Sequence, residues 1–211
     1  MSIVAVVSTL DGIAMSADGR LSDMREVGGE KIYYPVSDNS EKITLMRENT
    51  IAVGYFGEPA VFDNKTVTTM LDMLDERGIR KRDSVRMVAE KVRETFCFRY
   101  NLFGLTFFVA GYDKDEPFVY FVNFHNITRV NEQDSEILHG LWYGGSVTHV
   151  MPILDTFTFD PKLTPIGDAI DIAELAVDFS GKYNKYFHLD ETVGGKIRTV
   201  RINRDGAEFL F

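Results

Sequence analysis

The order of strand-like and helix-like segments constrains the fold of this chain more than any other feature of its sequence. Short β-branched or apolar runs predict strands, and apolar positions recurring every three or four residues predict helices. Strands are predicted at 3–7, 13–17, 42–45, 50–55, 105–112, 119–123, 141–143, 196–203 and 208–211, and helices at 59–77, 84–96 and 167–186. Strands and helices thus form separate runs, which disfavours a doubly wound parallel sheet. We expect an α+β fold with two antiparallel sheets and helices outside them.

Turn and capping residues mark several boundaries between these segments. Gly12 supplies the turn of an N-terminal hairpin, and Ser84 is a suitable cap for the second helix. Pro117 is expected in the turn between the two central strands. Residues 21–40 are polar and aperiodic, which predicts a loop.

The length and composition of the chain are those of one globular domain covering residues 1–211. The chain is 45% hydrophobic, which is enough to build a sizeable core. Its formal net charge of -9 and the lack of a Lys/Arg run argue against nucleic-acid binding. Neither a signal peptide nor a membrane-spanning run of about 18 apolar residues is recognisable. We therefore expect a cytoplasmic protein without membrane association.

Metal and thiol chemistry receive no support from the sequence. The single cysteine, Cys97, lies between Phe96 and Phe98 and is expected to be a small core residue. The four histidines are scattered without metal-ligand spacing. We expect neither a metal nor a cofactor.

Five segments, in register over nearly the whole chain, resemble one protein family. They are MSIVAVVSTLDGIAMSADGR, EKITLMRENTIAVGYFGEPA, GLTFFVAGYDKDEPFVYFVN, WYGGS and HLDETVGGKIRTVRINRDG. Together they resemble the proteasome β subunits and the related bacterial ring peptidase of the heat-shock locus. The resemblance implies the four-layer αββα sandwich of N-terminal-nucleophile (Ntn) hydrolases, in which two antiparallel sheets are flanked by helices.

The resemblance also implies a set of catalytic residues. Ser2 stands where the family has its N-terminal threonine, and Asp18 and Lys42 match its aspartate and lysine. Gly57 matches the glycine whose backbone N–H faces the oxyanion, and Asp190 matches a later aspartate that supports the nucleophile. These five residues form the predicted catalytic group.

Further positions are implied as supporting residues of the same site. Gly145 and Ser146, with Gly144, cover the place of a supporting serine, with the register open by one residue. Arg20 lies in the matching ADGR motif and Gly194 in the VGGKI motif.

The chemistry implied by this set starts at the N-terminus. An N-terminal hydroxyl residue carries its own base, because its α-amine has a reference pKa of about 7.7–8.0. A nearby Lys42 cation would lower that pKa, and Asp18 would hold Lys42 in place. The Ser2 hydroxyl would then attack a peptide or other amide bond. This requires removal of Met1, since otherwise the Ser2 nitrogen is an amide.

The sequence departs from the family at three places and leaves other functions open. Ser2 replaces threonine, Val193 stands where active relatives carry a hydroxyl residue, and the segment between Arg20 and Lys42 is longer. One alternative is a catalytically silent scaffold or binding subunit, and another is a small-molecule amidase. The resemblance implies a homo-oligomer. It also allows an unfoldase partner, for which the sequence offers no support of its own.

Overall fold

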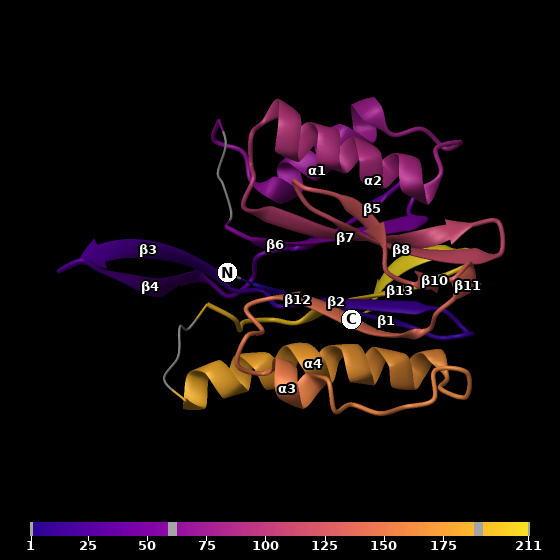
Figure 1. Cartoon of the computed structure of the whole chain (residues 1–211). Coiled ribbons are helices and arrows are strands. Elements are labelled where there is room, and N and C mark those ends of the chain that lie inside the picture. The colour runs from indigo at the N-terminus through magenta and orange to yellow at the C-terminus, as the bar shows by residue number, and fades with distance from the viewer. Residues whose placement is uncertain (1, 59–62, 188–191, 211) are drawn as a thin grey trace.

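Strands from both ends of the chain meet in one antiparallel sheet. The computed structural model describes residues 2–58, 63–187 and 192–210 (Figure 1). This sheet has the strand order β12-β1-β2-β13-β14, and its neighbours pair antiparallel. Its members are β1 (Ile3–Ser8), β2 (Ile13–Ala17), β12 (Gly140–Gly145), β13 (Arg198–Asn203) and β14 (Gly206–Leu210).

The middle of the chain forms a second antiparallel sheet with the order β5-β6-β7-β8-β9. The strands are β5 (Ile43–Met46), β6 (Ile51–Gly57), β7 (Leu105–Asp113), β8 (Glu116–Val122) and β9 (Ile127–Arg129). The two sheets face each other across one apolar cluster, which includes Val4 and Met15 from the first sheet and Ala52 and Phe108 from the second. The predicted α+β class with antiparallel sheets is therefore confirmed.

Two helices cover the outer face of the second sheet (Figure 1). They are α1 (Val67–Gly78) and α2 (Val85–Arg93), and α2 continues into a π-helical segment over Glu94–Arg99. Apolar side chains at helical spacing on α2, among them Val85, Val88 and Val92, are fully buried against the strands. The predicted cap is present, because Ser84 Oγ accepts a hydrogen bond from Met87 N at 3.1 Å.

The outer face of the first sheet is covered by α4 (Ile166–Tyr186), with the short α3 (Met151–Leu154) beside it (Figure 1). Small residues on α4 face the strands: Ala169, Ala173 and Ala176 are all fully buried. Small side chains allow the helix to lie close to β1 and β2. As a result β1 is buried on both faces, which explains its continuous apolar sequence.

Residues 21–40 contain a β-hairpin, so the predicted loop is wrong. The hairpin consists of β3 (Leu21–Val27) and β4 (Glu30–Ser37), which form a separate two-stranded sheet and project from the body (Figure 1). Its strands read as polar because they lack a face packed on the core. Cross-strand contacts stabilise it instead: Tyr34 Oη donates to Asp23 Oδ2 at 2.6 Å, and the Arg25 guanidinium lies 4.8 Å from the Tyr34 ring centroid.

Two other predicted boundaries are wrong. The first helix begins at Val67, after the Thr66 cap, and not at position 59. Residues 59–62 lie outside the described part of the chain. Pro117 lies within β8, opposite Tyr112, while the turn is formed by residues 114–115, with φ 58° at Lys114. Pro117 is the second residue of β8, close to the strand start, where the missing N–H of proline is tolerated; its carbonyl oxygen accepts from Asn131 Nδ2 at 2.9 Å.

The short strands β10 (Glu132–Gln133) and β11 (Glu136–Ile137) form a small additional hairpin. In the part of the chain that the structure describes, no helix combines the length and apolar character needed to cross a membrane.

Candidate active site

Ser2 is fixed where the first sheet begins. Its carbonyl oxygen accepts a hydrogen bond from Ser146 N at 2.8 Å, and the next residue, Ile3, pairs with Gly145 of β12. Gly145 has φ +116°, and a Cβ added there would come within 1.8 Å of the Ser2 carbonyl oxygen. The close approach of these two backbones therefore requires glycine.

Asp18 and Lys42 form the predicted ion pair directly beside Ser2. Lys42 Nζ lies 2.7 Å from Asp18 Oδ1, and the two side chains are only 2% and 1% exposed. The same carboxylate oxygen accepts a hydrogen bond from Ile3 N at 2.9 Å. Because that N–H belongs to the peptide bond between Ser2 and Ile3, one oxygen connects the lysine to the backbone of Ser2.

Burial dominates the electrostatics of Lys42. Removal from water lowers the pKa of the Lys42 ammonium below its ordinary value, the charge and hydrogen bond of Asp18 act in the opposite direction, and Arg20 lowers the pKa further. A buried cation of this kind is stable only with its partner present. Burial of the pair therefore costs desolvation free energy, which a lysine in solvent at the edge of a strand would avoid.

The second oxygen of Asp18 ties the site to the loop before β13. Asp18 Oδ2 accepts hydrogen bonds from Arg20 N and Gly194 N, both at 3.2 Å. The Arg20 side chain turns outward to Asp38, with 2.7 Å between Nε and Oδ1. Gly194 has φ +151°, and a Cβ there would lie 2.9 Å from Arg20 Cζ. These contacts join Arg20 and Gly194 to the predicted group.

Of the two remaining predicted catalytic residues, the structure describes only Gly57. Gly57 ends β6 with φ +115° and pairs with Leu105, and a Cβ on it would lie 2.1 Å from the Gly104 carbonyl oxygen. Phe56 next to it packs so closely on Gly144 of β12 that a Cβ on Gly144 would be 2.3 Å from the ring. The oxyanion role of Gly57 stays a prediction. Asp190 lies outside the described residues.

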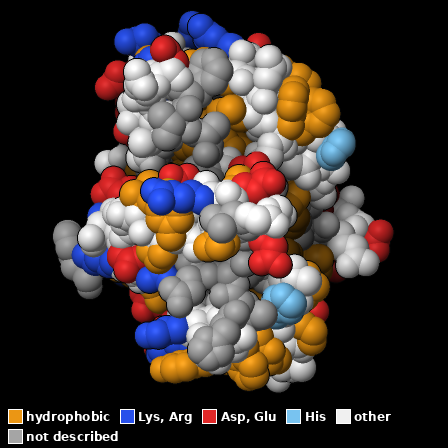
Figure 2. Space-filling view, turned by 90° about the vertical axis from the view of Figure 1, so that its left-hand side faces the viewer, with side chains coloured by type: hydrophobic (Ala, Val, Ile, Leu, Met, Phe, Trp, Pro, Cys, Tyr) orange, Lys and Arg blue, Asp and Glu red, His pale blue; other side chains and the backbone are white. Residues whose placement is uncertain are grey.

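Sequence reasoning missed Glu41, Arg198 and Asp38 at the rim of the site. Arg198 NH2 lies 2.9 Å from Glu41 Oε1, which links the start of β13 to the residue before Lys42. Asp38 pairs with Arg20 and lies just after the β3–β4 hairpin. Acidic and basic side chains are interspersed around the hairpin at this end of the molecule (Figure 2). No motif marked these residues, because each pairing joins positions far apart in the sequence.

The surroundings of the site include an apolar wall and a small hollow. Val193 is 2% exposed and belongs to the apolar cluster that contains Ile3 and Val177. A hollow of about 210 Å³ lies between α4 and the 193–197 segment, and both Asp18 and Arg20 line it. A much larger hollow lies elsewhere, between α2 and the second sheet. The buried ion pair marks the candidate site better than the size of a hollow does, because catalysis requires reactive groups that converge on one point.

Within residues 2–58, 63–187 and 192–210, no group of three His, Cys, Asp or Glu side chains is placed to hold an ion. What the site provides chemically is a buried cation–carboxylate pair next to a hydroxyl residue at the start of a strand.

Comparison with known proteins does not assign this chain to a family. No protein-family model matches the sequence, and a search of curated proteins found no match.

Proposed function

We propose that the protein is a proteasome-like Ntn hydrolase that cleaves peptide or other amide bonds with Ser2 as nucleophile after Met1 is removed. The observation that carries this proposal is the buried Lys42–Asp18 pair, whose shared oxygen also binds Ile3 N. A lysine buried to this extent needs a reason, and lowering the pKa of an adjacent α-amine is one. If Met1 is retained, the Ser2 nitrogen is an amide without such a pKa, and this explanation for the buried lysine does not apply.

The proposed reaction uses groups of this chain alone. The Ser2 α-amine takes the proton of the Ser2 hydroxyl as its oxygen attacks the carbonyl carbon of the substrate. The tetrahedral oxyanion receives a hydrogen bond from Gly57 N. The amine then protonates the leaving nitrogen, the C–N bond breaks, and an ester on Ser2 remains. Water hydrolyses the ester by the same proton route. In this proposal Asp190 and Ser146 support the nucleophile.

The arrangement of layers supports the same assignment. We propose that the two stacked antiparallel sheets, with α1 and α2 on one side and α4 on the other, represent the αββα sandwich of Ntn hydrolases. The proposed homo-oligomer and cytoplasmic location rest on the sequence resemblance. Since one fold hosts many functions, the residues around Ser2 carry more weight than the layers.

One observation favours the alternative of a silent scaffold. Val193 is buried among apolar side chains, so it offers no hydrogen bond where active relatives have a hydroxyl. A fold of this type without activity would keep its layers and its assembly surfaces.

The test compares three proteins: the Ser-first chain, the chain that retains Met1, and the Ser2→Ala chain. A panel of amide and short-peptide substrates is incubated with each, and intact mass verifies each N-terminus. We expect turnover by the Ser-first protein alone, because only it has both hydroxyl and amine. Equal turnover by all three would assign the chemistry to another residue. No turnover by any of them would favour the scaffold.

A further inference from the structure

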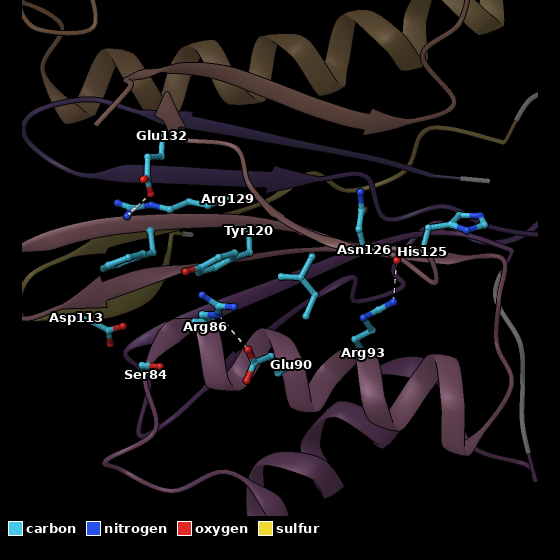
Figure 3. A pocket seen from close by; sticks show the side chains of 12 residues that line it. Ser84, Arg86, Glu90, Arg93, Asp113, Tyr120, His125, Asn126, Arg129 and Glu132 are labelled. Atoms are coloured by element: carbon cyan, nitrogen blue, oxygen red, sulfur yellow. Dashed lines mark hydrogen bonds and ion pairs between the residues drawn. The ribbon is translucent and has the colours of Figure 1, made fainter. Parts of the chain in front are cut away.

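A hollow much larger than the one beside Asp18 lies apart from the residues of the proposed hydrolysis. It has a volume of about 780 Å³ and lies between α2 and strands β8 and β9 (Figure 3). None of Ser2, Asp18 and Lys42 lines it. Its walls combine aromatic rings from β8 with arginine side chains from α2 and β9.

Tyr120 is the polar group at the floor of this hollow. The residue is 7% exposed, and its hydroxyl makes no hydrogen bond to any other residue of the described chain. Its ring stacks on Phe118, with centroids 6.1 Å apart and an angle of 8° between the planes. The ring is therefore held by packing while its hydroxyl faces the hollow (Figure 3). The Tyr120 oxygen is accessible from the hollow, so the hydroxyl can donate a hydrogen bond to a ligand oxygen there.

The two arginines near Tyr120 differ in how many of their guanidinium donors are hydrogen-bonded. Arg129 donates to Glu132 at 2.7 Å and to Glu116 at 2.6 Å, and its Cζ lies 3.9 Å from the Phe118 ring centroid. Arg86 donates only through Nε, to Glu90 at 3.0 Å. Among the described residues its terminal nitrogens have no partner, and Figure 3 shows the guanidinium below Tyr120. The Arg86 side chain is 72% exposed, so its terminal nitrogens are solvated and can bind a second acceptor.

The protonation state of Tyr120 fits a donor role. Burial raises the pKa of the Tyr120 hydroxyl, and among the charges around it Arg129 and Arg86 act more strongly than Asp113 and Glu132. The hydroxyl therefore stays protonated at neutral pH. The stronger positive field at the oxygen favours an anionic group beside it.

We propose that this hollow is a binding site for a small organic carboxylate with an apolar body. The carboxylate accepts hydrogen bonds from the Tyr120 hydroxyl and the terminal nitrogens of Arg86, and the apolar body lies against Phe118 and Ile127, which line the hollow. A carboxylate suits a guanidinium because two parallel N–H donors match its two oxygens.

Three acidic residues line the hollow, Glu90, Asp113 and Glu132, and Glu132 is paired with Arg129. The Asp113 carboxylate forms an ion pair with Arg47 at 2.7 Å and accepts a hydrogen bond from Val85 N at 2.8 Å. It therefore does not compete with the ligand for Arg86. Glu90 does compete, because it occupies one side of Arg86. A doubly charged phosphate would meet more repulsion from Glu90 than a carboxylate does.

Calorimetric titration of the whole protein with N-acetylphenylalanine and with its neutral amide tests the site. We expect saturable binding of the acid and at least about tenfold weaker binding of the amide, since hydrogen bonds to a charged group are lost. Tyr120→Phe and Arg86→Gln should each weaken the acid by about tenfold. Glu90→Gln should strengthen it, because it frees Arg86 and removes a repelling charge.

Matched controls lie outside the hollow. Tyr112 is also 7% exposed, and Arg77 is an exposed arginine at the end of α1. Tyr112→Phe and Arg77→Gln should leave the affinity unchanged. The proposal is overturned if the acid fails to bind, if acid and amide bind equally, if the controls weaken binding as much, or if Glu90→Gln weakens it. Glu90 is exposed, so its variant stays informative even where Tyr120→Phe affects folding.

Discussion

Asp18 holds more of the candidate site together than its position in an Asp-Gly turn would suggest. One oxygen binds Lys42 Nζ and Ile3 N, and the other accepts from Arg20 N and Gly194 N. The carboxylate is therefore shared by β1, β2, the start of β5 and the loop before β13. Such a fully satisfied buried charge is stabilising only as a complete set.

Replacing Asp18 with Asn should destabilise the protein strongly. The change leaves the Lys42 ammonium buried without a counter-charge, and loss of one partner of a buried pair costs about 3–5 kcal/mol. Urea denaturation of both proteins at neutral pH measures the difference. The control is Asp178→Asn, which breaks the exposed pair with Lys182 and should cause no measurable loss. Similar small effects of both changes would show that the Lys42 charge is not dependent on Asp18.

His139 should make the protein less stable in mild acid. Burial, together with the Lys162 charge, holds the pKa of the His139 imidazole below its ordinary value of 6.5, and Ser8 Oγ lies 3.1 Å from its Nδ1. As the pH falls below 6.5, the unfolded chain binds a proton at His139 before the folded chain does. The free energy of unfolding therefore decreases as the pH drops from 6.5 to the folded-state pKa of His139.

The measurement is the free energy of unfolding at several pH values from 7.5 downwards, for wild type and His139→Gln. Wild type should lose more stability than the variant over this interval, because glutamine does not titrate. Parallel curves would show that His139 has the same proton affinity in both states.

At the scale of elements, sequence patterns located those with a buried face and missed those without one. The periodic apolar positions of α2 and α4 and the continuous run of β1 could be recognised because each packs on a core. The β3–β4 hairpin could not, since its pairing depends on contacts such as Tyr34 with Asp23. The candidate site shows the same difference. Asp18 and Lys42 could be predicted from matching side chains in the sequence, whereas the backbone hydrogen bond from Gly194 N to Asp18 leaves no pattern in the sequence.

A methyl group on Gly145 of β12 should disturb the site through the backbone. Its Cβ would overlap the Ser2 carbonyl oxygen, and φ +116° is strained for alanine, so Gly145→Ala should cost at least about 2 kcal/mol. Gly140 begins the same strand, and a Cβ there meets nothing within 4 Å. Thermal and urea denaturation should therefore leave Gly140→Ala within about 0.5 kcal/mol of wild type. Equal effects of the two changes would contradict the close approach of β12 to Ser2.

At the scale of the whole molecule, the layers bring distant parts of the chain to one place. The first sheet places β1 and β2 next to β13, and the second sheet supplies Lys42 through the start of β5. Neither sheet alone contains the complete ion pair, because Asp18 follows β2 and Lys42 precedes β5. Stacking of the two sheets is therefore a condition for the proposed site.

The most direct test of the Ser2 assignment is to locate the product of covalent labelling. An aliphatic β-lactone acylates an activated hydroxyl, and peptide mass mapping then identifies the labelled residue. We expect one adduct per chain, on the Ser2 oxygen of the Ser-first protein, and none on the protein that retains Met1 or carries Ser2→Ala. An adduct on another residue in all three proteins, or no adduct on the Ser-first protein, would contradict the role of Ser2 as nucleophile.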